Sequence, residues 1–351
     1  YTFEKRYLMN PFFKYKSFIV LSILFITGNA WALNKDQLMG SFLSVVMIRG
    51  YNEAGGLAFG SGVVVGENQV ITNCHVLRRT KQPWVSQGEE TYSVTSVKAD
   101  HWHDLCLVTT FGTLPNKPAI LGKSTDLKKG QEVIAIGHSN GVPAPLTSAG
   151  NVKSTYDLDQ GKVILSSAQF RMGASGSGLF DTEGRLVGIN TFKTSGRNSY
   201  YYALPIEWLN SLKNKPAETN FPITGVALWE EEEDKKPLFL QVAIPTLKED
   251  WKKLLNISSE WTKKESNNAE AWFELGFANE HLNDLNAAEK AYRQSIKLDD
   301  QNTDALMHLG FIAKSKDDKK EIKLIQDQIT KINPDLLDDY FKLVGCSKTC
   351  E

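Results

Sequence analysis

Residues 60–76 read GSGVVVGENQVITNCHV, and this stretch decides the fold class. It holds two short apolar runs, Gly62–Val65 and Val70–Thr72, with a glycine-containing polar turn between them. Short runs rich in valine and isoleucine and bounded by turn residues are typical of β-strands. We therefore expect two strands here, and the second strand delivers His75 at its end.

Similar runs recur at close spacing from Asp36 to Leu212, where helical periodicity is almost absent. Many short strands separated by glycine-containing turns predict an all-β sandwich or a pair of barrels, and the length of 36–212 suits two barrels. The further expected strands are Phe42–Ile48, Ser93–Val97, Leu105–Thr109, Glu132–Ile136, Val163–Ser166, Leu186–Asn190 and Tyr200–Leu204.

Two more motifs complete a pattern of histidine, acid and serine in chain order. Residues 100–108 read DHWHDLCLV, and residues 172–180 read MGASGSGLF. A serine hydroxyl becomes an effective nucleophile when an imidazole takes its proton, so we assign His75 as general base to Ser175. Asp104 is expected to orient the imidazole and to stabilise its charged form. Gly173 lets the loop curl, so that the backbone N–H groups of Gly173 and Ser175 form an oxyanion hole.

Residues 72–76 (TNCHV), Asp104-Leu105 and residues 173–176 (GASG) resemble the three catalytic motifs of chymotrypsin/trypsin-like serine proteases, and most closely the bacterial Deg/HtrA-like branch. The resemblance covers about 42–209. It implies a double β-barrel that hydrolyses peptide bonds through an acyl-enzyme without a cofactor. Ala174 and Ser177 depart from the family pattern. The absence of an acid at Ala174 implies a site formed without zymogen cleavage, while both departures leave a catalytically inactive, protein-binding scaffold as the alternative.

The resemblance also implies where substrate specificity is set. The expected pocket residues carry no acid, which argues against a preference for Lys or Arg and favours small or medium apolar side chains. These residues are Gln169, Phe170, Thr191, Phe192 and Tyr200.

The four cysteines fall into two groups of two that are expected to lie close together. If His75 and Asp104 touch, Cys74 and Cys106 must be near neighbours, and both a disulfide and a pair of buried thiols fit this arrangement. Cys346 and Cys350 are close enough in sequence to close a small terminal ring.

A metal site is the competing interpretation of the histidines around Asp104. His75, His101, His103 and Asp104 carry metal-ligating groups, but a metal centre would leave the glycine-rich loop at 173–178 without a role. We expect no metal and no cofactor.

The C-terminal part, residues 247–345, is helical and repetitive. Trp272 and Leu306, like Gly276 and Gly310, lie 34 residues apart, which is the period of the tetratricopeptide repeat (TPR). The two units are 269–302 and 303–336. Two units bury too little core alone, so we expect a preceding helix at Trp251–Lys263 and a capping segment at Asp335–Leu343. Apolar residues on the first helix of each unit provide a groove for a peptide of the substrate or of a partner protein.

Residues 213–246 differ from both flanking parts. The segment begins with a Lys-Asn-Lys-Pro breaker and contains five consecutive acids, Glu230–Asp234. Acid runs are typical of solvated spacers, so we interpret this segment as an acidic linker.

The sequence of the N-terminal residues 1–32 predicts an upstream extension followed by a secretory signal peptide, with cleavage after Ala32. An uncleaved membrane anchor is the alternative. With signal cleavage we expect a periplasmic or secreted protein that does not span the membrane.

A net charge of −1 over 351 residues gives no basic field for nucleic acid. The sequence thus predicts a multidomain serine endopeptidase with a peptide or protein substrate.

Overall fold

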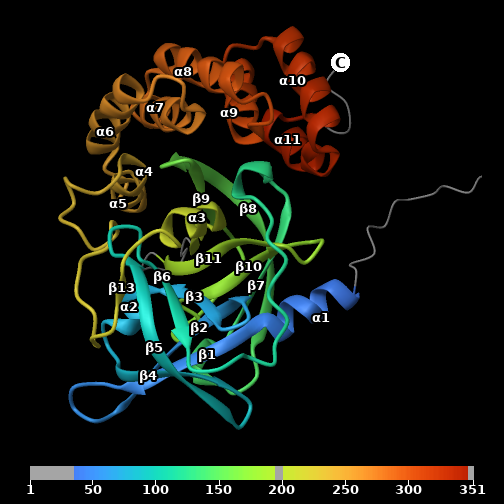
Figure 1. Cartoon of the computed structure of the whole chain (residues 1–351). Helices are drawn as coiled ribbons and strands as arrows, with labels where there is room; N and C mark the ends of the chain where they lie inside the picture. Colours follow the sequence, from blue (N-terminus) through green and yellow to red (C-terminus); the bar gives the residue numbers. More distant parts are fainter. Residues whose placement is uncertain (1–34, 194–200, 347–351) are drawn as a thin grey trace, which may run out of the picture. The chain divides into compact units, whose positions relative to one another are not determined.

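The computed structural model describes residues 35–193 and 201–346 (Figure 1). The expected signal peptide, with its cleavage after Ala32, lies outside these residues. All the described residues belong to one compact unit. None of the helices in the two described ranges combines the length and the apolar character that a membrane crossing requires.

The first barrel closes through six antiparallel strands in the order β4-β1-β2-β3-β6-β5, with β5 returning to β4. A short strand, β13 (Ala217–Glu218), adds to the outer edge of β5. Val46, Ile48 and Val64 project into a fully buried core, as alternation along a strand requires. The strands are β1 (Val45–Tyr51), β2 (Leu57–Gly66), β3 (Gln69–Asn73), β4 (Lys81–Gln87), β5 (Glu90–Asp100) and β6 (Leu105–Thr110).

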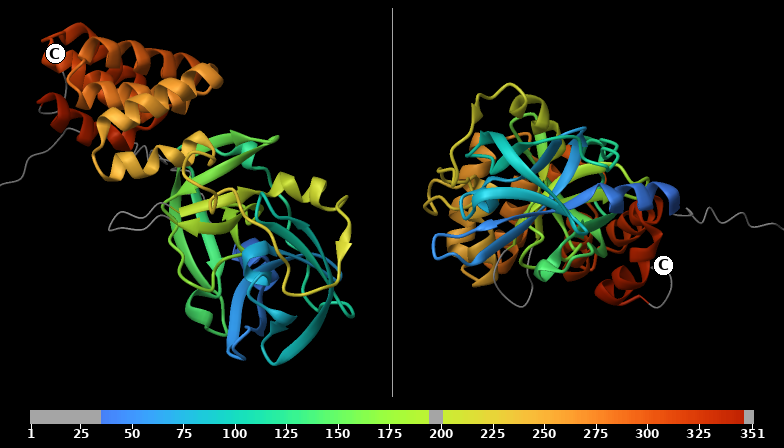
Figure 2. Two further views of the ribbon diagram at one scale, coloured as in Figure 1. Left: turned by 90° about the vertical axis from the view of Figure 1, so that its left-hand side faces the viewer. Right: turned by 60° about the horizontal axis from the view of Figure 1, so that its bottom comes forward.

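The second barrel closes in the order β10-β11-β12-β9-β8-β7, and its core includes Val133, Ile164 and Leu179. Figure 2 shows both barrels from two further sides. The predicted double β-barrel is confirmed. Its strands are β7 (Glu132–Gly137), β8 (Leu146–Leu158), β9 (Gly161–Ser166), β10 (Ser177–Asp181), β11 (Leu186–Lys193) and β12 (Tyr201–Pro205).

Several strand boundaries differ from the prediction. The expected strand Phe42–Ile48 begins only at Val45, because Phe42 belongs to the helix α1 (Lys35–Ser44). β4 and β8 were not predicted, since β4 contains Pro83 and β8 is polar along most of its length. Their strand conformation follows from the partner strands on either side, which local propensity does not reveal.

The helical part consists of consecutive helices in contact, as Figures 1 and 2 show. Five of these helices begin directly after an aspartate or asparagine whose side chain accepts the backbone N–H three residues on, which is the preferred N-cap arrangement. The helices are α6 (Trp251–Lys264), α7 (Ala269–His281), α8 (Leu285–Leu298), α9 (Thr303–Ser315), α10 (Lys319–Ile332) and α11 (Leu337–Val344).

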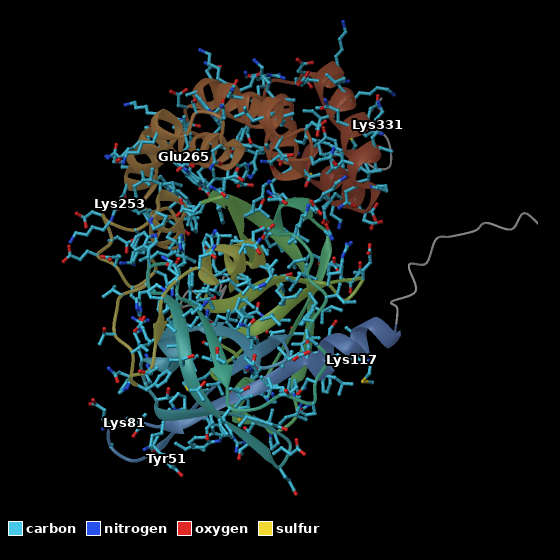
Figure 3. The ribbon with its side chains drawn as sticks, in the orientation of Figure 1. Tyr51, Lys81, Lys117, Lys253, Glu265 and Lys331 are labelled. Atoms are coloured by element: carbon cyan, nitrogen blue, oxygen red, sulfur yellow. A yellow bond between two sulfur atoms is a disulfide. The ribbon has the colours of Figure 1, made fainter. Side chains whose placement is uncertain are left out.

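Glycines set the spacing between these helices. A Cβ on Gly276 would lie 2.6 Å from the ring of Tyr292, so α7 and α8 approach closely only because residue 276 has no side chain. Charged side chains such as Lys253 and Lys331 are exposed on the helices, as Figure 3 shows.

The segment 213–246, expected to be a linker, is packed at several points. It contains the short helices α4 (Leu238–Gln241) and α5 (Ala243–Leu247). Phe239 is buried and stacks on Tyr156 of β8 with ring centroids 4.6 Å apart. The same core continues from the second barrel through Phe239 to Trp261 of α6. The apolar residues that follow the acid run therefore attach this segment to the second barrel.

Candidate active site

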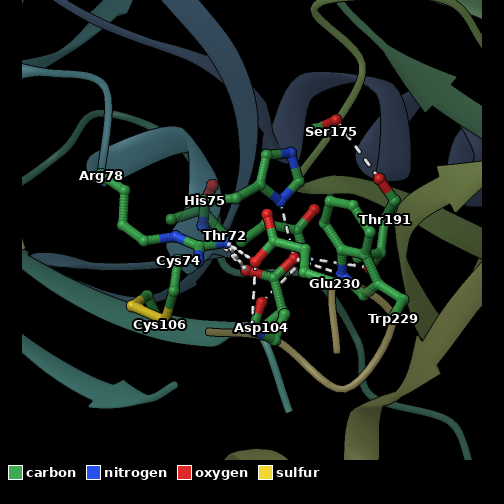
Figure 4. A network of polar contacts seen from close by, with 12 residues as sticks. Thr72, Cys74, His75, Arg78, Asp104, Cys106, Ser175, Thr191, Trp229 and Glu230 are labelled. Carbon is green, nitrogen blue, oxygen red and sulfur yellow. Dashed lines mark hydrogen bonds and ion pairs between the residues drawn. A yellow bond between two sulfur atoms is a disulfide. The ribbon is translucent and has the colours of Figure 1, made fainter. Parts of the chain in front are cut away.

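His75 lies where the chain turns from β3 into the short helix α2 (Cys74–Leu77). Its backbone N–H donates to Oδ1 of Asp104 at 2.8 Å, and its ring Nδ1 lies 2.6 Å from Oδ2 of the same carboxylate. Figure 4 shows this pair at the centre of a polar network. Because the carboxylate accepts, Nδ1 carries the proton and Nε2 is left for proton transfer.

Asp104 adopts a left-handed backbone conformation with φ of 53°, which aspartate tolerates better than most residues. Its carbonyl oxygen accepts from the N–H of Cys74 and from the side-chain amide of Asn73. The residue is fully buried. These contacts hold the carboxylate directly against His75.

The loop that carries Ser175 is fixed by a residue of the other barrel. Ser61 of β2 donates from its N–H to the carbonyl oxygen of Ser175 and from its hydroxyl to the carbonyl oxygen of Gly173, both at 2.8 Å. Gly173 has φ of 91°, and a Cβ there would meet the ring of Phe59 at 2.6 Å. The carbonyl groups of the loop are thus paired, whereas the N–H groups of Gly173 and Ser175 donate to no group in the described residues.

Ser175 and His75 face the same pocket, of about 610 Å³, together with Gly173. The hydroxyl of Ser175 donates to the carbonyl oxygen of Thr191 at 3.3 Å, as the dashed line in Figure 4 marks. The described residues contain no direct hydrogen bond between Ser175 and His75. The structure therefore brings the three predicted catalytic residues together, with the serine side chain turned toward β11.

Sequence reasoning missed two residues that contact Asp104, and a third that pairs with one of them. The indole Nε1 of Trp229 donates to Oδ2 of Asp104 at 3.1 Å, and the Trp229 ring meets His75 edge-on at a centroid distance of 5.4 Å. Arg78 lies 3.8 Å from Oδ1 of Asp104 and forms an ion pair with Glu230 at 2.6 Å. Trp229 and Glu230 belong to the segment expected to be a linker, and nothing in the local sequence relates them to Asp104.

The disulfide between Cys74 and Cys106 resolves the alternative that the sequence left open. The bond joins α2 to β6 immediately beside His75 and Asp104. Cys346 is disulfide-bonded as well. Cys350 lies outside the described residues.

The expected specificity residues are spread over different surroundings. Gln169 is exposed, whereas Phe170 is buried against Tyr201 with ring centroids 5.2 Å apart. Thr191 is buried beside Ser175, and Phe192 lines a pocket together with Trp229. Tyr200 lies outside the described residues.

The remaining histidines near Asp104 pair with other acids. His101 contacts Glu218 at 3.2 Å, and His103 contacts Asp100 at 3.1 Å and Asp159 at 2.9 Å. Burial raises the pKa of Asp100, but the hydrogen bond and charge of His103 outweigh burial and hold this pKa at about 2. The described residues contain no group of three or more His, Cys, Asp or Glu side chains arranged to hold a metal ion.

Comparison with known proteins finds a family match within each of the two parts of the chain. Residues 60–189 match the family model of the trypsin-like peptidase domain, and residues 269–302 match that of the tetratricopeptide repeat. The chain is 32% identical over 158 residues to the anti-sigma-I factor RsgI9 of Acetivibrio thermocellus, and 31% identical over 154 residues to the serine protease HTRA4 of Mus musculus.

These alignments cover 44% and 40% of this chain but 22% and 31% of the two relatives, so the chain spans well under two thirds of their length. Among solved structures, the active form of the Rv3671c protease from M. tuberculosis aligns with 55% of this chain and 89% of that chain, at 21% identity and a TM-score of 0.48. This chain thus contains a trypsin-like peptidase domain related to those of HtrA serine proteases, followed by a tetratricopeptide repeat.

Proposed function

We propose that this protein is a serine endopeptidase that cleaves peptide bonds through an acyl-enzyme on Ser175. His75 takes the proton of the Ser175 hydroxyl during attack and returns it to the leaving amine. Asp104 keeps the imidazole in the correct tautomer and stabilises its charged form. The N–H groups of Gly173 and Ser175 stabilise the negative oxygen of the tetrahedral intermediate.

The observation that carries this proposal is the short His75–Asp104 contact beside a pocket that His75 shares with Gly173 and Ser175, whose backbone N–H groups have no acceptor in the described residues. Rotation of the Ser175 side chain away from Thr191 would bring its hydroxyl toward Nε2 of His75. Catalytic hydrogen bonds are often absent or long before substrate binds, so the observed serine rotamer fits a resting state.

Two further features support a periplasmic or secreted location, which we propose as well. The N-terminal sequence has the pattern of a signal peptide, and the Cys74–Cys106 disulfide suits an oxidising compartment. We also propose that the helical repeats bind protein, as repeats of this kind commonly present peptide-binding surfaces.

The decisive experiment is labelling of the folded protein with a fluorophosphonate probe, which reacts with an activated serine. We expect labelling of the wild type, none of Ser175→Ala, and normal labelling of Ser93→Ala, which removes an exposed hydroxyl on β5. Absence of labelling in a folded wild type would favour the non-catalytic scaffold.

Asp104→Asn should lower kcat by roughly 10⁴, the size of this effect in the well-studied serine proteases, measured on a peptide that the wild type cleaves.

A further inference from the structure

A second pocket, of about 400 Å³, lies between the end of β11 and the helices α4 and α5. Its apolar lining consists of Phe192, Trp229, Leu240, Ala243, Ile244 and Leu247. Most of this lining belongs to the segment after the barrels, outside the matched peptidase domain. Its volume falls in the range of pockets that enclose small ligands or large side chains.

One aromatic ring separates this pocket from the catalytic residues. Trp229 lines the pocket and meets the imidazole of His75 edge-on, while its Nε1 donates to Asp104. Phe192 stacks on Trp229 with ring centroids 5.4 Å apart. Phe192 also directly follows Thr191, whose carbonyl oxygen accepts from Ser175. Figure 4 shows Trp229 next to both Asp104 and Thr191. The pocket therefore lies on the other side of Trp229 from His75 and Asp104.

The end of β11 offers a route from Ser175 into this pocket. β10 begins at Ser177, which pairs with Asn190, so Thr191–Lys193 run past the start of β10. In the described part of the chain, no strand pairs with that edge of Thr191–Lys193. An extended peptide can add to such an edge, advancing about 3.3 Å per residue. A peptide with its reacting carbonyl at Ser175 then brings a nearby side chain to Phe192 and Trp229.

The charges around the pocket restrict what can enter it. Among the described residues, three lysines (Lys193, Lys236 and Lys248) and one acid (Glu233) line the pocket, and Glu233 is already paired with Lys236 at 2.9 Å. A cationic side chain is therefore disfavoured. Ile244 and Leu247 are each 39% exposed, so they present apolar surface that an entering side chain would cover.

We propose that this pocket is a substrate subsite for a bulky apolar side chain, located two to four residues from the scissile bond. The inference rests on the proposed function, because it assumes that the substrate's carbonyl reacts at Ser175. It gives α4 and α5 a direct role in specificity, so that the segment between the barrels and the repeats completes the substrate cleft.

The test is cleavage-site profiling. The full chain and its variants digest a proteome-derived peptide library, and mass spectrometry reads the residues around each cleaved bond. We expect the wild type to favour Leu, Ile, Met or Phe at one position two to four residues from the bond. Leu247→Asp and, separately, Ile244→Asp should lower kcat/KM for such peptides about tenfold. Leu324→Asp is the matched control, since Leu324 is 53% exposed on α10 and does not line the pocket.

Fluorophosphonate labelling of every variant separates this inference from the proposed function. Unchanged labelling together with a lost apolar preference in both pocket variants supports the subsite. A wild type that labels and cleaves without such a preference, or a preference that both pocket variants retain, overturns the subsite alone. A wild type that neither labels nor cleaves overturns the proposed function and the subsite with it.

Discussion

The carboxylate of Asp104 accepts three hydrogen bonds in a fully buried position, two from His75 and one from Trp229. A buried carboxylate needs such donors, because it has lost its contacts with water. The bonds from His75 also fix the imidazole. The bond from Trp229 has a different origin, since this residue lies outside both barrels. Trp229 is therefore a positioning residue that acts on His75 through Asp104.

Replacing Trp229 with phenylalanine tests this role, because Phe keeps an aromatic ring and removes the N–H donor. We expect fluorophosphonate labelling to slow about tenfold, which is the order of effect for losing a hydrogen bond to a charged group. Trp272→Phe is the matched control, since it removes an indole donor that binds the carbonyl oxygen of Ser266 in the helical part. Equal labelling rates in the two variants would show that the Trp229 donor has no catalytic effect.

At the scale of elements, the disulfide between Cys74 and Cys106 ties α2 to β6. The bond closes a loop of 32 residues that includes both His75 and Asp104. A disulfide that closes a loop of this length stabilises the folded protein by about 2–4 kcal/mol, chiefly because it restricts the unfolded chain.

The double variant Cys74→Ala with Cys106→Ala should therefore lose about 2–4 kcal/mol of unfolding free energy, measured by urea denaturation. The control is Cys346→Ala with Cys350→Ala, which removes two cysteines only four positions apart in sequence and should cost about half as much. Equal losses in the two double variants would contradict this account.

The elements also show which features the sequence can predict. β2, β3 and β6 were predicted because their β-branched runs are local signals, and α7 was predicted from the repeat period. β8 could not be predicted in this way, because its polar residues form a strand only between β7 and β9. The contact of Trp229 with Asp104 joins positions 125 residues apart and follows from tertiary packing alone.

At the scale of the whole molecule, the helical part and the second barrel share polar contacts. Lys129, in the loop before β7, lies 2.8 Å from Asp304 of α9 and 3.7 Å from Glu270 of α7. Its ammonium group also lies 5.4 Å from the ring centroid of Phe273. Part of the helical face expected to hold a peptide therefore already contacts a residue of the same chain.

Glu274 of α7 lies in the same region and carries a buried carboxylate oxygen that has no hydrogen-bond partner in the described residues. Burial, together with the charge of Glu270, raises the pKa of Glu274 to about 8, although Lys129 acts in the opposite direction. The carboxyl group therefore keeps its proton at neutral pH in the folded protein. In the unfolded chain it ionises near its ordinary value of 4.5.

This difference predicts how stability depends on pH. Because the pKa of Glu274 is raised in the folded protein, its contribution to the free energy of unfolding is fully present below pH 4.5. This contribution is lost as the pH rises to about 8. Glu274→Gln cannot ionise, so the variant should become more stable than the wild type across this window, by about 1–3 kcal/mol at pH 8.5. Thermal unfolding at pH 4.5, 6.5 and 8.5 measures the difference, with Glu249→Gln at an exposed position as the control. A constant difference between Glu274→Gln and the wild type at all three pH values would show that Glu274 ionises alike in the folded and unfolded chain, which the burial of its carboxylate oxygen argues against.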